Sequence, residues 1–166
     1  MNAQWWLPDV RATQGLGGAL ARSLRWDPQA PRLLYLSGEL GAGKTTLAAA
    51  VLHALGVEEA VRSPSYALIE TYPMASGQAV HVDLYRLRGA GELQPLGLSD
   101  YLGGRTLLLL EWPERAGPAL PPPDLALQLS TDPDPAISGR RAQLGARSPA
   151  GAAWLAATTA AMPKQI

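Results

Sequence analysis

The chain has 166 residues, and the 47% that are hydrophobic suffice to build one substantial core. Its 14 Lys and Arg residues balance 14 Asp and Glu residues, so the charge gives no reason to expect a nucleic-acid backbone, such as DNA, or an anionic membrane as the main partner. The chain has no cysteine and only two histidines, so disulfides and thiolate catalysis are excluded and any metal should be a hard cation held by oxygen atoms.

The N-terminal residues (MNAQWWLPDV) lack the basic start and the continuous apolar stretch of a signal peptide. No apolar run approaches the roughly 18 residues that a membrane span needs. We therefore expect a cytoplasmic protein that does not enter a membrane.

The first third of the chain predicts a helix, a strand and a second helix. Apolar residues recur at helical spacing over residues 13–24, where Thr13 is a reasonable N-cap. Residues 33–36 are apolar and are followed by glycines, which favours a buried strand. Residues 47–55 are rich in strong helix formers and end at Gly56. A strand, a glycine-rich turn and a helix thus follow one another.

The rest of the chain predicts further strands and one clear helix. The predicted elements are two strands of a hairpin at 67–72 and 79–84, an irregular helical segment at 92–102, a strand at 106–111, an antiparallel hairpin within 124–146 and a helix at 152–160. Four consecutive leucines in the strand at 106–111 indicate burial on both faces, as in a parallel sheet. We expect a single α/β domain over residues 1–166, with a central mixed, mainly parallel sheet flanked by helices.

Residues 38–45 match the phosphate-binding motif G-x-x-x-x-G-K-[ST] between the predicted strand and helix. In this motif the backbone N–H groups converge on phosphate oxygens, Lys44 reaches the β- and γ-phosphates, and the Thr45 hydroxyl ligates Mg²⁺. The alternative is a glycine turn that only caps a helix. Lys44 is one of two lysines in a chain that otherwise uses arginine, which favours the functional interpretation. The predicted nucleotide-binding residues of this segment are Glu39, Leu40, Gly41, Ala42, Gly43, Lys44, Thr45 and Thr46.

Two acidic residues are candidates for the carboxylate that phosphoryl chemistry needs near its metal. Glu111 ends the leucine-rich strand and is the better match to a Walker-B-like acid, whereas Asp83 ends an earlier strand. Each could also be an ordinary charged residue that leaves a strand. Because both lie at strand ends, we expect both to reach one site, with Thr45 and Glu111 as the metal ligands.

Residues 62–66 follow the motif by about twenty residues, where nucleotide switches place a hydroxyl that senses the γ-phosphate and the metal. Ser65 is the candidate hydroxyl, and a plain Ser-Pro turn is an equal alternative. Trp112 follows Glu111 directly and could be a core aromatic residue, a stacking platform or a partner contact.

Two other features favour structural roles. His81 lies in a predicted strand and is expected to be packed or exposed rather than catalytic. Arg140, Arg141 and Arg147 form a basic cluster, but aspartates precede it, so we expect a solvated face of the hairpin.

Together these segments resemble the TsaE family, formerly YjeE, the small P-loop ATPases of bacterial tRNA threonylcarbamoyladenosine synthesis. The Asp-Leu-Tyr-Arg and Glu-Trp-Pro-Glu-Arg segments are far more specific than the phosphate-binding motif. The matching segments occur in family order: GELGAGKTT at 38–46, SPSYALIETY at 63–72, HVDLYRL at 81–87, ELQPLGLSDYL at 92–102 and LLLLEWPERA at 107–116.

The resemblance implies a P-loop α/β fold and a Mg²⁺-dependent ATPase, weak alone, that binds a TsaB–TsaD heterodimer. That heterodimer attaches threonylcarbamoyl to an adenosine beside the tRNA anticodon, and we expect only indirect contact of this chain with tRNA. By position, Lys44 and Thr45 match the family's phosphate and metal residues, Glu111 its Walker-B-like acid, and Asp83 and Trp112 its other functional pair. The expected catalytic residues are therefore Lys44, Asp83, Glu111 and Trp112.

Two other functions stay open at this point. One is a small P-loop nucleotide or metabolite kinase, although no segment resembles the arginine-bearing lid of such kinases. The other is a non-hydrolysing, nucleotide-gated binding module, in which ATP only orders residues 63–66 for a partner. The family's usual switch, Ser-Pro-Thr-Phe, is Ser-Pro-Ser-Tyr here, and Ser65 keeps the hydroxyl that a metal or γ-phosphate sensor needs.

Overall fold

The computed structural model describes residues 1–132, 134 and 138–162, whose strands form one seven-stranded sheet. The strand order is β1-β7-β6-β2-β5-β4-β3. The strands are β1 Asn2–Leu7, β2 Arg32–Ser37, β3 Ile69–Met74, β4 Gly77–Asp83, β5 Thr106–Glu111, β6 Leu125–Thr131 and β7 Arg140–Ala146. The α-helices are α1 Val10–Ser23, α2 Lys44–Ala54 and α3 Pro149–Ala161.

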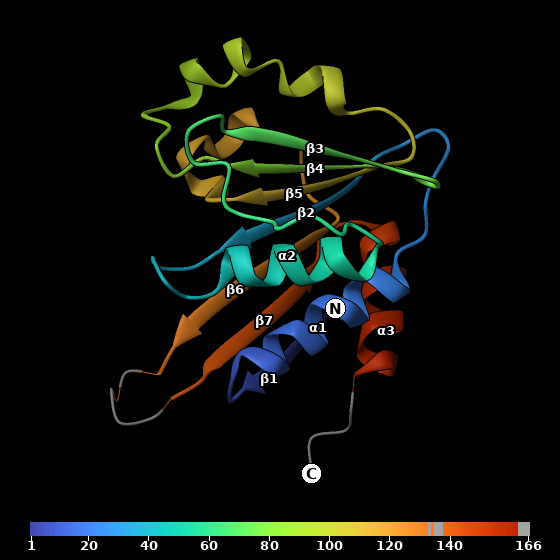
Figure 1. The fold of residues 1–166 in the computed structure, drawn as a ribbon, viewed down its shortest axis with the longest axis vertical. Helices are drawn as coiled ribbons and strands as arrows, with labels where there is room; N and C mark the ends of the chain where they lie inside the picture. The colour runs from blue at the N-terminus through green and yellow to red at the C-terminus, as the bar shows by residue number, and fades with distance from the viewer. Residues whose placement is uncertain (133, 135–137, 163–166) are drawn as a thin grey trace.

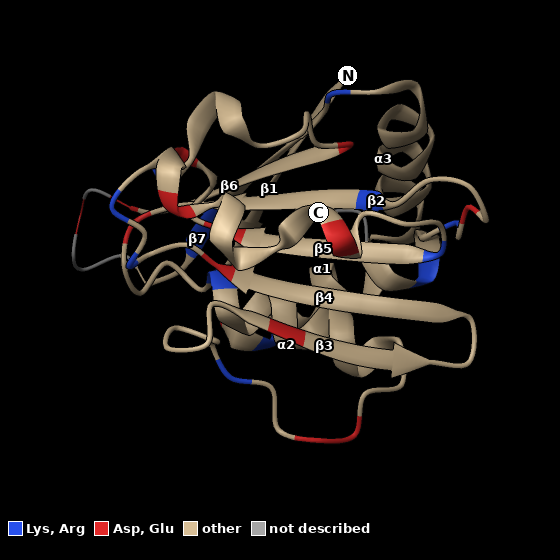
Figure 2. Ribbon diagram, turned by 90° about the horizontal axis from the view of Figure 1, so that it is seen from above, with Lys and Arg blue, Asp and Glu red and all other residues tan. Residues whose placement is uncertain are grey.

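The centre of the sheet is parallel and its edges are antiparallel. Strands β6, β2, β5 and β4 are parallel neighbours, whereas β3 lies antiparallel to β4, and β7 and β1 continue the other edge in antiparallel pairs. Figure 2 shows β2, β5, β4 and β3 side by side. The predicted α/β fold with a mixed central sheet is therefore confirmed, and the carboxyl ends of β2, β4 and β5 meet at one edge.

The three α-helices cover one face of the sheet (Figure 1). The other face is covered by the segments that flank β5, which contain short 3₁₀ turns. Leu107 and Leu109 enter the core under the helices, whereas Leu108 and Leu110 enter the core on the opposite face, as the twofold period of a strand requires. Within the described residues, no helix has the length and apolar character that crossing a membrane needs.

The N-terminal segment differs from the sequence prediction. β1 is absent from the predicted elements, because this edge strand buries only two of its six residues, Trp5 and Leu7, and so gives a weak pattern. The predicted start of α1 at Thr13 is wrong, since the helix begins at Val10. Asp9 is the N-cap, and its carboxylate accepts a first-turn backbone N–H at 2.8 Å.

The irregular helical segment predicted at 92–102 is confirmed as a run of short 3₁₀ turns. Pro95 cannot donate a backbone hydrogen bond, and Gly97 has a φ of 65°, so a continuous α-helix does not form. The hairpin predicted from the strands at 67–72 and 79–84 is present as β3 and β4, but β3 begins two residues later than expected. The 3₁₀ turns are η1 Ala90–Glu92, η2 Gln94–Leu96, η3 Leu98–Tyr101, η4 Pro113–Arg115 and η5 Gly117–Ala119.

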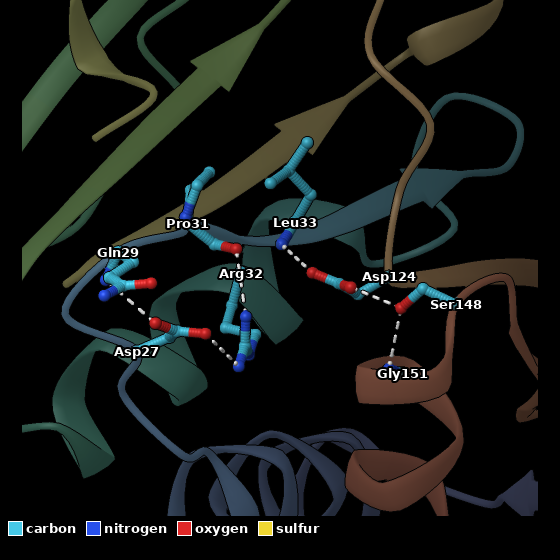
Figure 3. A network of polar contacts seen from close by, with 8 residues as sticks. All are labelled: Asp27, Gln29, Pro31, Arg32, Leu33, Asp124, Ser148 and Gly151. Atoms are coloured by element: carbon cyan, nitrogen blue, oxygen red, sulfur yellow. Dashed lines mark hydrogen bonds and ion pairs between the residues drawn. The ribbon is translucent and has the colours of Figure 1, made fainter. Parts of the chain in front are cut away.

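Asp124, just before β6, joins β6 to β2 and α3 (Figure 3). Its carboxylate accepts the N–H of Leu33 at 3.0 Å and the hydroxyl of Ser148. Ser148 is the N-cap of α3 and accepts the N–H of Gly151 at 2.9 Å. A Cβ on Gly151 would lie 1.9 Å from the Asp124 carbonyl oxygen, so only glycine fits this close approach. These contacts fix where β6 starts beside β2.

Candidate functional site

A cleft of about 420 Å³ lies where the carboxyl ends of β4 and β5 meet the start of α2. In open α/β sheets, ligands bind at this edge. Among the predicted nucleotide-binding residues, Glu39 and Ala42 do not line the cleft: the Glu39 carboxylate accepts the Thr131 hydroxyl, and Ala42 is buried. The lining residues are Leu40, Gly41, Gly43, Lys44, Thr45, Thr46, Ser63, Ser65, Asp83, Tyr85, Arg86, Glu111, Trp112 and Arg140.

The glycine-rich loop, residues 38–43, connects β2 to α2. Gly41 and Gly43 have φ angles of 80° and 104°, which residues with a side chain rarely adopt. At Gly38, a Cβ would lie 2.4 Å from the carbonyl oxygen of Leu129 on β6. The glycines therefore let the chain turn directly into α2, whose first backbone N–H groups favour an anion.

Lys44 folds back onto this loop. Its Nζ donates to the carbonyl of Gly38 at 2.6 Å and to that of Glu39 at 2.9 Å, and it lies 3.8 Å from the centre of the Trp112 ring. The side chain is only 4% exposed. This burial lowers the pKa of Lys44, and nearby carboxylates, Glu111 first among them, oppose the shift. The ammonium is thus held beside the place where phosphates are expected.

Glu111 ends β5 and is 2% exposed. The Thr45 hydroxyl donates to both of its carboxylate oxygens, at 2.9 and 3.0 Å. The Nε2 atom of His81 lies 2.8 Å from Oε1 of the same carboxylate. His81 is packed, which was one of the two predictions for it. Its contact with Glu111 could not be predicted from local pattern, because 30 residues separate the two partners.

Asp83 ends β4 and contacts the segment that the sequence identified as a candidate switch. Its carboxylate accepts the hydroxyl of Ser63 and the N–H of Tyr85, the latter at 2.9 Å. Ser65 also lines the cleft, whereas the side chain of Tyr66 is 86% exposed. Asp83 therefore links the edge of the sheet to residues 63–66.

Trp112 has a φ of 60°, a left-handed conformation that turns the chain sharply after β5. Its backbone N–H donates to the Leu36 carbonyl at 3.1 Å, and its ring lies 5.0 Å from that of Tyr85. The ring also packs against the core on the side of the sheet that lacks the α-helices. Trp112 is therefore both a core contact and a wall of the cleft beside Lys44.

The β6–β7 hairpin contacts the glycine-rich loop. The Thr131 hydroxyl and N–H donate to Glu39 and hold the pKa of that carboxyl below its usual value. The expectation of a solvated face is wrong for Arg140, because its Nη2 lies 3.4 Å from the Gly41 carbonyl and its side chain lines the cleft. Its Nε is buried without a hydrogen-bond partner among the described residues. Arg141, by contrast, is exposed, as expected.

The donor set suits a metal only in combination with a ligand. The described residues contain no group of three His, Cys, Asp or Glu side chains that could hold a metal ion by themselves. Mg²⁺ commonly takes one or two protein oxygens and fills its shell with phosphates and water. The Thr45 hydroxyl can keep its hydrogen bond to Glu111 while it offers a lone pair to such a cation. Thr45 and Glu111 therefore fit a Mg²⁺ ion that arrives with a nucleotide.

Comparison with known proteins identifies the family. The family model described as "Threonylcarbamoyl adenosine biosynthesis protein TsaE" matches residues 7–141. This chain belongs to the TsaE family. The resemblance inferred from the motifs is therefore confirmed, and the TsaE match covers the glycine-rich loop, both acidic strand ends and the start of β7.

Curated relatives called tRNA threonylcarbamoyladenosine biosynthesis protein TsaE agree with this assignment. The protein from Haemophilus influenzae is 40% identical over 97 residues, which are 58% of this chain and 61% of that protein. The protein from Rickettsia felis is 35% identical over 124 residues, or 74% of this chain and 70% of the relative. The match to the first of these spans less than two thirds of the relative's length.

A solved structure shares the TsaE fold described above. The crystal structure of Bacillus subtilis YdiB superimposes with a TM-score of 0.77, over 96% of this chain and 95% of that chain. The two sequences are 22% identical, so the likeness shows the fold.

Proposed function

We propose that this TsaE-family protein binds ATP with Mg²⁺ and hydrolyses it, weakly when alone, in support of threonylcarbamoyladenosine formation on cytoplasmic tRNA. The family match places the chain in threonylcarbamoyl adenosine biosynthesis. The observation that carries the proposal is the convergence of Lys44, Thr45 and Glu111 in one cleft beside the glycine-rich loop. A cation, a hydroxyl and a carboxylate in this arrangement suit the phosphates of a nucleotide and their metal.

Lys44 is assigned to the β- and γ-phosphates. Its ammonium now donates to two loop carbonyls, which are neutral partners for a buried charge. Phosphate oxygens would form stronger, charge-assisted hydrogen bonds with the same group. Bound Mg²⁺ would supply further positive charge at the phosphate oxygens, where Thr45 and Glu111 would hold it.

Asp83 is assigned to the attacking water or to the position of residues 63–66. Its carboxylate already accepts the Ser63 hydroxyl and the Tyr85 N–H, and both of these residues line the cleft. A change in what Asp83 binds would therefore move the Ser63 segment. Ser65, which lines the same cleft, supplies the hydroxyl that would sense the γ-phosphate.

A TsaB–TsaD heterodimer is the proposed partner, and it would dock on residues 63–66 and the neighbourhood of Trp112. Tyr66 is 86% exposed, and the guanidinium of Arg86 lies 4.3 Å from the centre of its ring. Aromatic and arginine side chains carry a large share of the energy of protein interfaces. Because Asp83 contacts the same segment, the nucleotide state would bias this surface, and contact with tRNA would be mostly indirect.

Phosphorus NMR separates this function from its two rivals. The protein is incubated with ATP and Mg²⁺, with and without nucleoside monophosphates or small hydroxylated metabolites. Release of inorganic phosphate that does not depend on an acceptor supports an ATPase. Phosphorylation of an acceptor would show a kinase, and bound but intact ATP would show a nucleotide-gated binding module.

A further inference from the structure

His81 is a buried polar residue to which the proposed function assigns no role. It lies in β4, opposite Leu109 of β5, and is 0% exposed. Residues 79 and 107, which share its face of the sheet by the twofold strand period, belong to the core under the α-helices. His81 therefore points to the side of the sheet on which α2 lies.

The contact of His81 with Glu111 restricts the carboxylate. Nε2 of His81 lies 2.8 Å from Oε1, whereas Oε2 accepts only the Thr45 hydroxyl among the described residues. A carboxylate only accepts hydrogen bonds, so this contact requires a proton on Nε2. The Nδ1 atom is buried and has no hydrogen-bond partner among the described residues. One ring nitrogen is thus committed to Glu111, and the other makes no competing contact.

The burial of Glu111 makes its hydrogen bond to His81 important for the stability of the charged carboxylate. Glu111 is 2% exposed, and a buried carboxylate needs hydrogen-bond donors to replace the water that it has lost. Among the described residues, the side chains of Thr45 and His81 donate hydrogen bonds to this carboxylate. Without His81, the Thr45 hydroxyl would be the one hydrogen-bond donor left to this carboxylate among the described residues.

We infer that His81 is a positioning residue that holds Glu111 in the orientation required to meet a nucleotide-bound divalent cation. It donates a hydrogen bond to Oε1 and leaves Oε2, together with the Thr45 hydroxyl, for the metal shell. This inference rests on the proposed function, because it needs a metal beside Glu111. Partners that orient metal ligands in this way typically change metal affinity by about 10- to 100-fold when they are removed.

The test compares His81→Ala and His81→Gln with the parent. The side-chain amide of glutamine can donate from near the position of Nε2, whereas alanine cannot. The other histidine, His53, supplies the matched control, since it is exposed at the end of α2 and its ring contacts the Glu59 carbonyl at 3.2 Å, away from Glu111. Mn²⁺ affinity in the presence of saturating ADP is measured by electron paramagnetic resonance, and ADP affinity is measured without metal.

We expect His81→Ala to weaken Mn²⁺ binding by about tenfold or more, with ADP affinity in the absence of metal unchanged. His81→Gln should recover most of the loss, and His53→Ala should match the parent. Parent-like Mn²⁺ binding by His81→Ala would overturn the inference. Equal losses in folded His81→Gln and His81→Ala would also overturn it, because they would show that the ring serves only to fill the core.

A second measurement needs neither metal nor nucleotide. Nitrogen NMR of the metal-free parent should show a protonated His81 Nε2 whose signal shifts strongly in Glu111→Gln. A signal that does not respond to Glu111→Gln would contradict the contact, even where His81→Ala fails to fold. Should the parent bind neither ADP nor Mn²⁺, the proposed function would fail, while this signal would still test whether His81 holds Glu111.

Discussion

The Thr45 hydroxyl lies 2.9 Å from the Glu111 carboxylate, so the first turn of α2 is hydrogen-bonded to the end of β5. Asp83, although it pairs with Glu111 in the β4–β5 register, holds Ser63 and Tyr85 instead. Two carboxylates at neighbouring strand ends thus have different partners. This difference is the basis for separating their roles.

We predict that Glu111→Ala and Asp83→Ala differ in their response to Mg²⁺. Glu111 is a proposed metal ligand, so the variant that lacks it should need about tenfold or more Mg²⁺ for half-maximal activity. Loss of Asp83 should lower kcat while nucleotide affinity is largely kept. Mg²⁺ titrations of ATP hydrolysis check this prediction, and indistinguishable titrations for the two variants would remove the division of labour.

Arg140→Ala should weaken ADP binding by about tenfold, because the Arg140 guanidinium is a cation that lines the cleft beside Gly41. Arg141→Ala is the matched control, since the neighbouring side chain is exposed and does not line the cleft. Isothermal titration calorimetry measures both affinities. Equal affinities in the two variants would place Arg140 outside the nucleotide site.

Trp112→Ala should reduce the affinity of the ATP–Mg²⁺ state for the TsaB–TsaD heterodimer by about 30-fold, the loss expected for an interface hot spot. Biolayer interferometry with ATP–Mg²⁺ and with ADP measures it, and thermal unfolding of the variant controls for its packing against the core. Parent-like binding by the variant would leave Trp112 as a core residue. Equal affinity for the heterodimer with ATP–Mg²⁺ and with ADP, or tight binding to isolated tRNA, would refute the proposal that nucleotide controls docking on the heterodimer.

Two buried tyrosines that do not line the cleft, Tyr35 and Tyr72, should make the free energy of unfolding depend on pH. Burial raises the pKa of Tyr35 well above its ordinary 10.0, and burial with the nearby Glu70 raises that of Tyr72 to about 12. A pKa that is higher in the folded state gives stability that is complete below pH 10 and is lost as the pH rises beyond it. Urea unfolding should therefore show a free energy of unfolding that falls above pH 10.

Tyr35→Phe tests the tyrosine contribution directly. The Tyr35 hydroxyl donates to the Pro121 carbonyl at 2.6 Å, so its removal should cost about 1 kcal/mol at neutral pH. Between pH 10 and 11, the free energy of unfolding should fall less in Tyr35→Phe than in the parent, because the variant lacks one phenol whose pKa is raised in the folded state. An alkaline loss as steep as that of the parent would show that Tyr35 does not contribute to it.

The sequence predicts the parts of this protein that depend on local pattern. Four consecutive leucines indicate a strand buried on both faces, and β5 has that burial. The motif at 38–45 indicates a loop between a strand and a helix, and the loop joins β2 to α2. Both follow from short stretches of chain whose residue types restrict the backbone.

What the sequence did not predict depends on contacts between distant residues. In the sequence, His81 looks like an ordinary strand residue. In the structure, the parallel register places β4 beside β5, and the His81 ring therefore reaches Glu111. Arg140 belongs to a basic cluster in the sequence, yet in the structure the β6–β7 hairpin places Arg140, and not its neighbour Arg141, against the loop at Gly41. Such pairings are set by the three-dimensional arrangement of the strands and leave no local pattern.

The most direct test of the central claim is phosphate release from ATP by the parent and by Lys44→Ala, measured with excess Mg²⁺ by phosphorus NMR. We predict release by the parent and a rate about 100-fold lower in the variant, because Lys44 is the buried cation beside the expected phosphates. Circular dichroism should show that both proteins are folded. Equal rates of phosphate release in the two folded proteins would contradict the assignment of this cleft as an ATPase site.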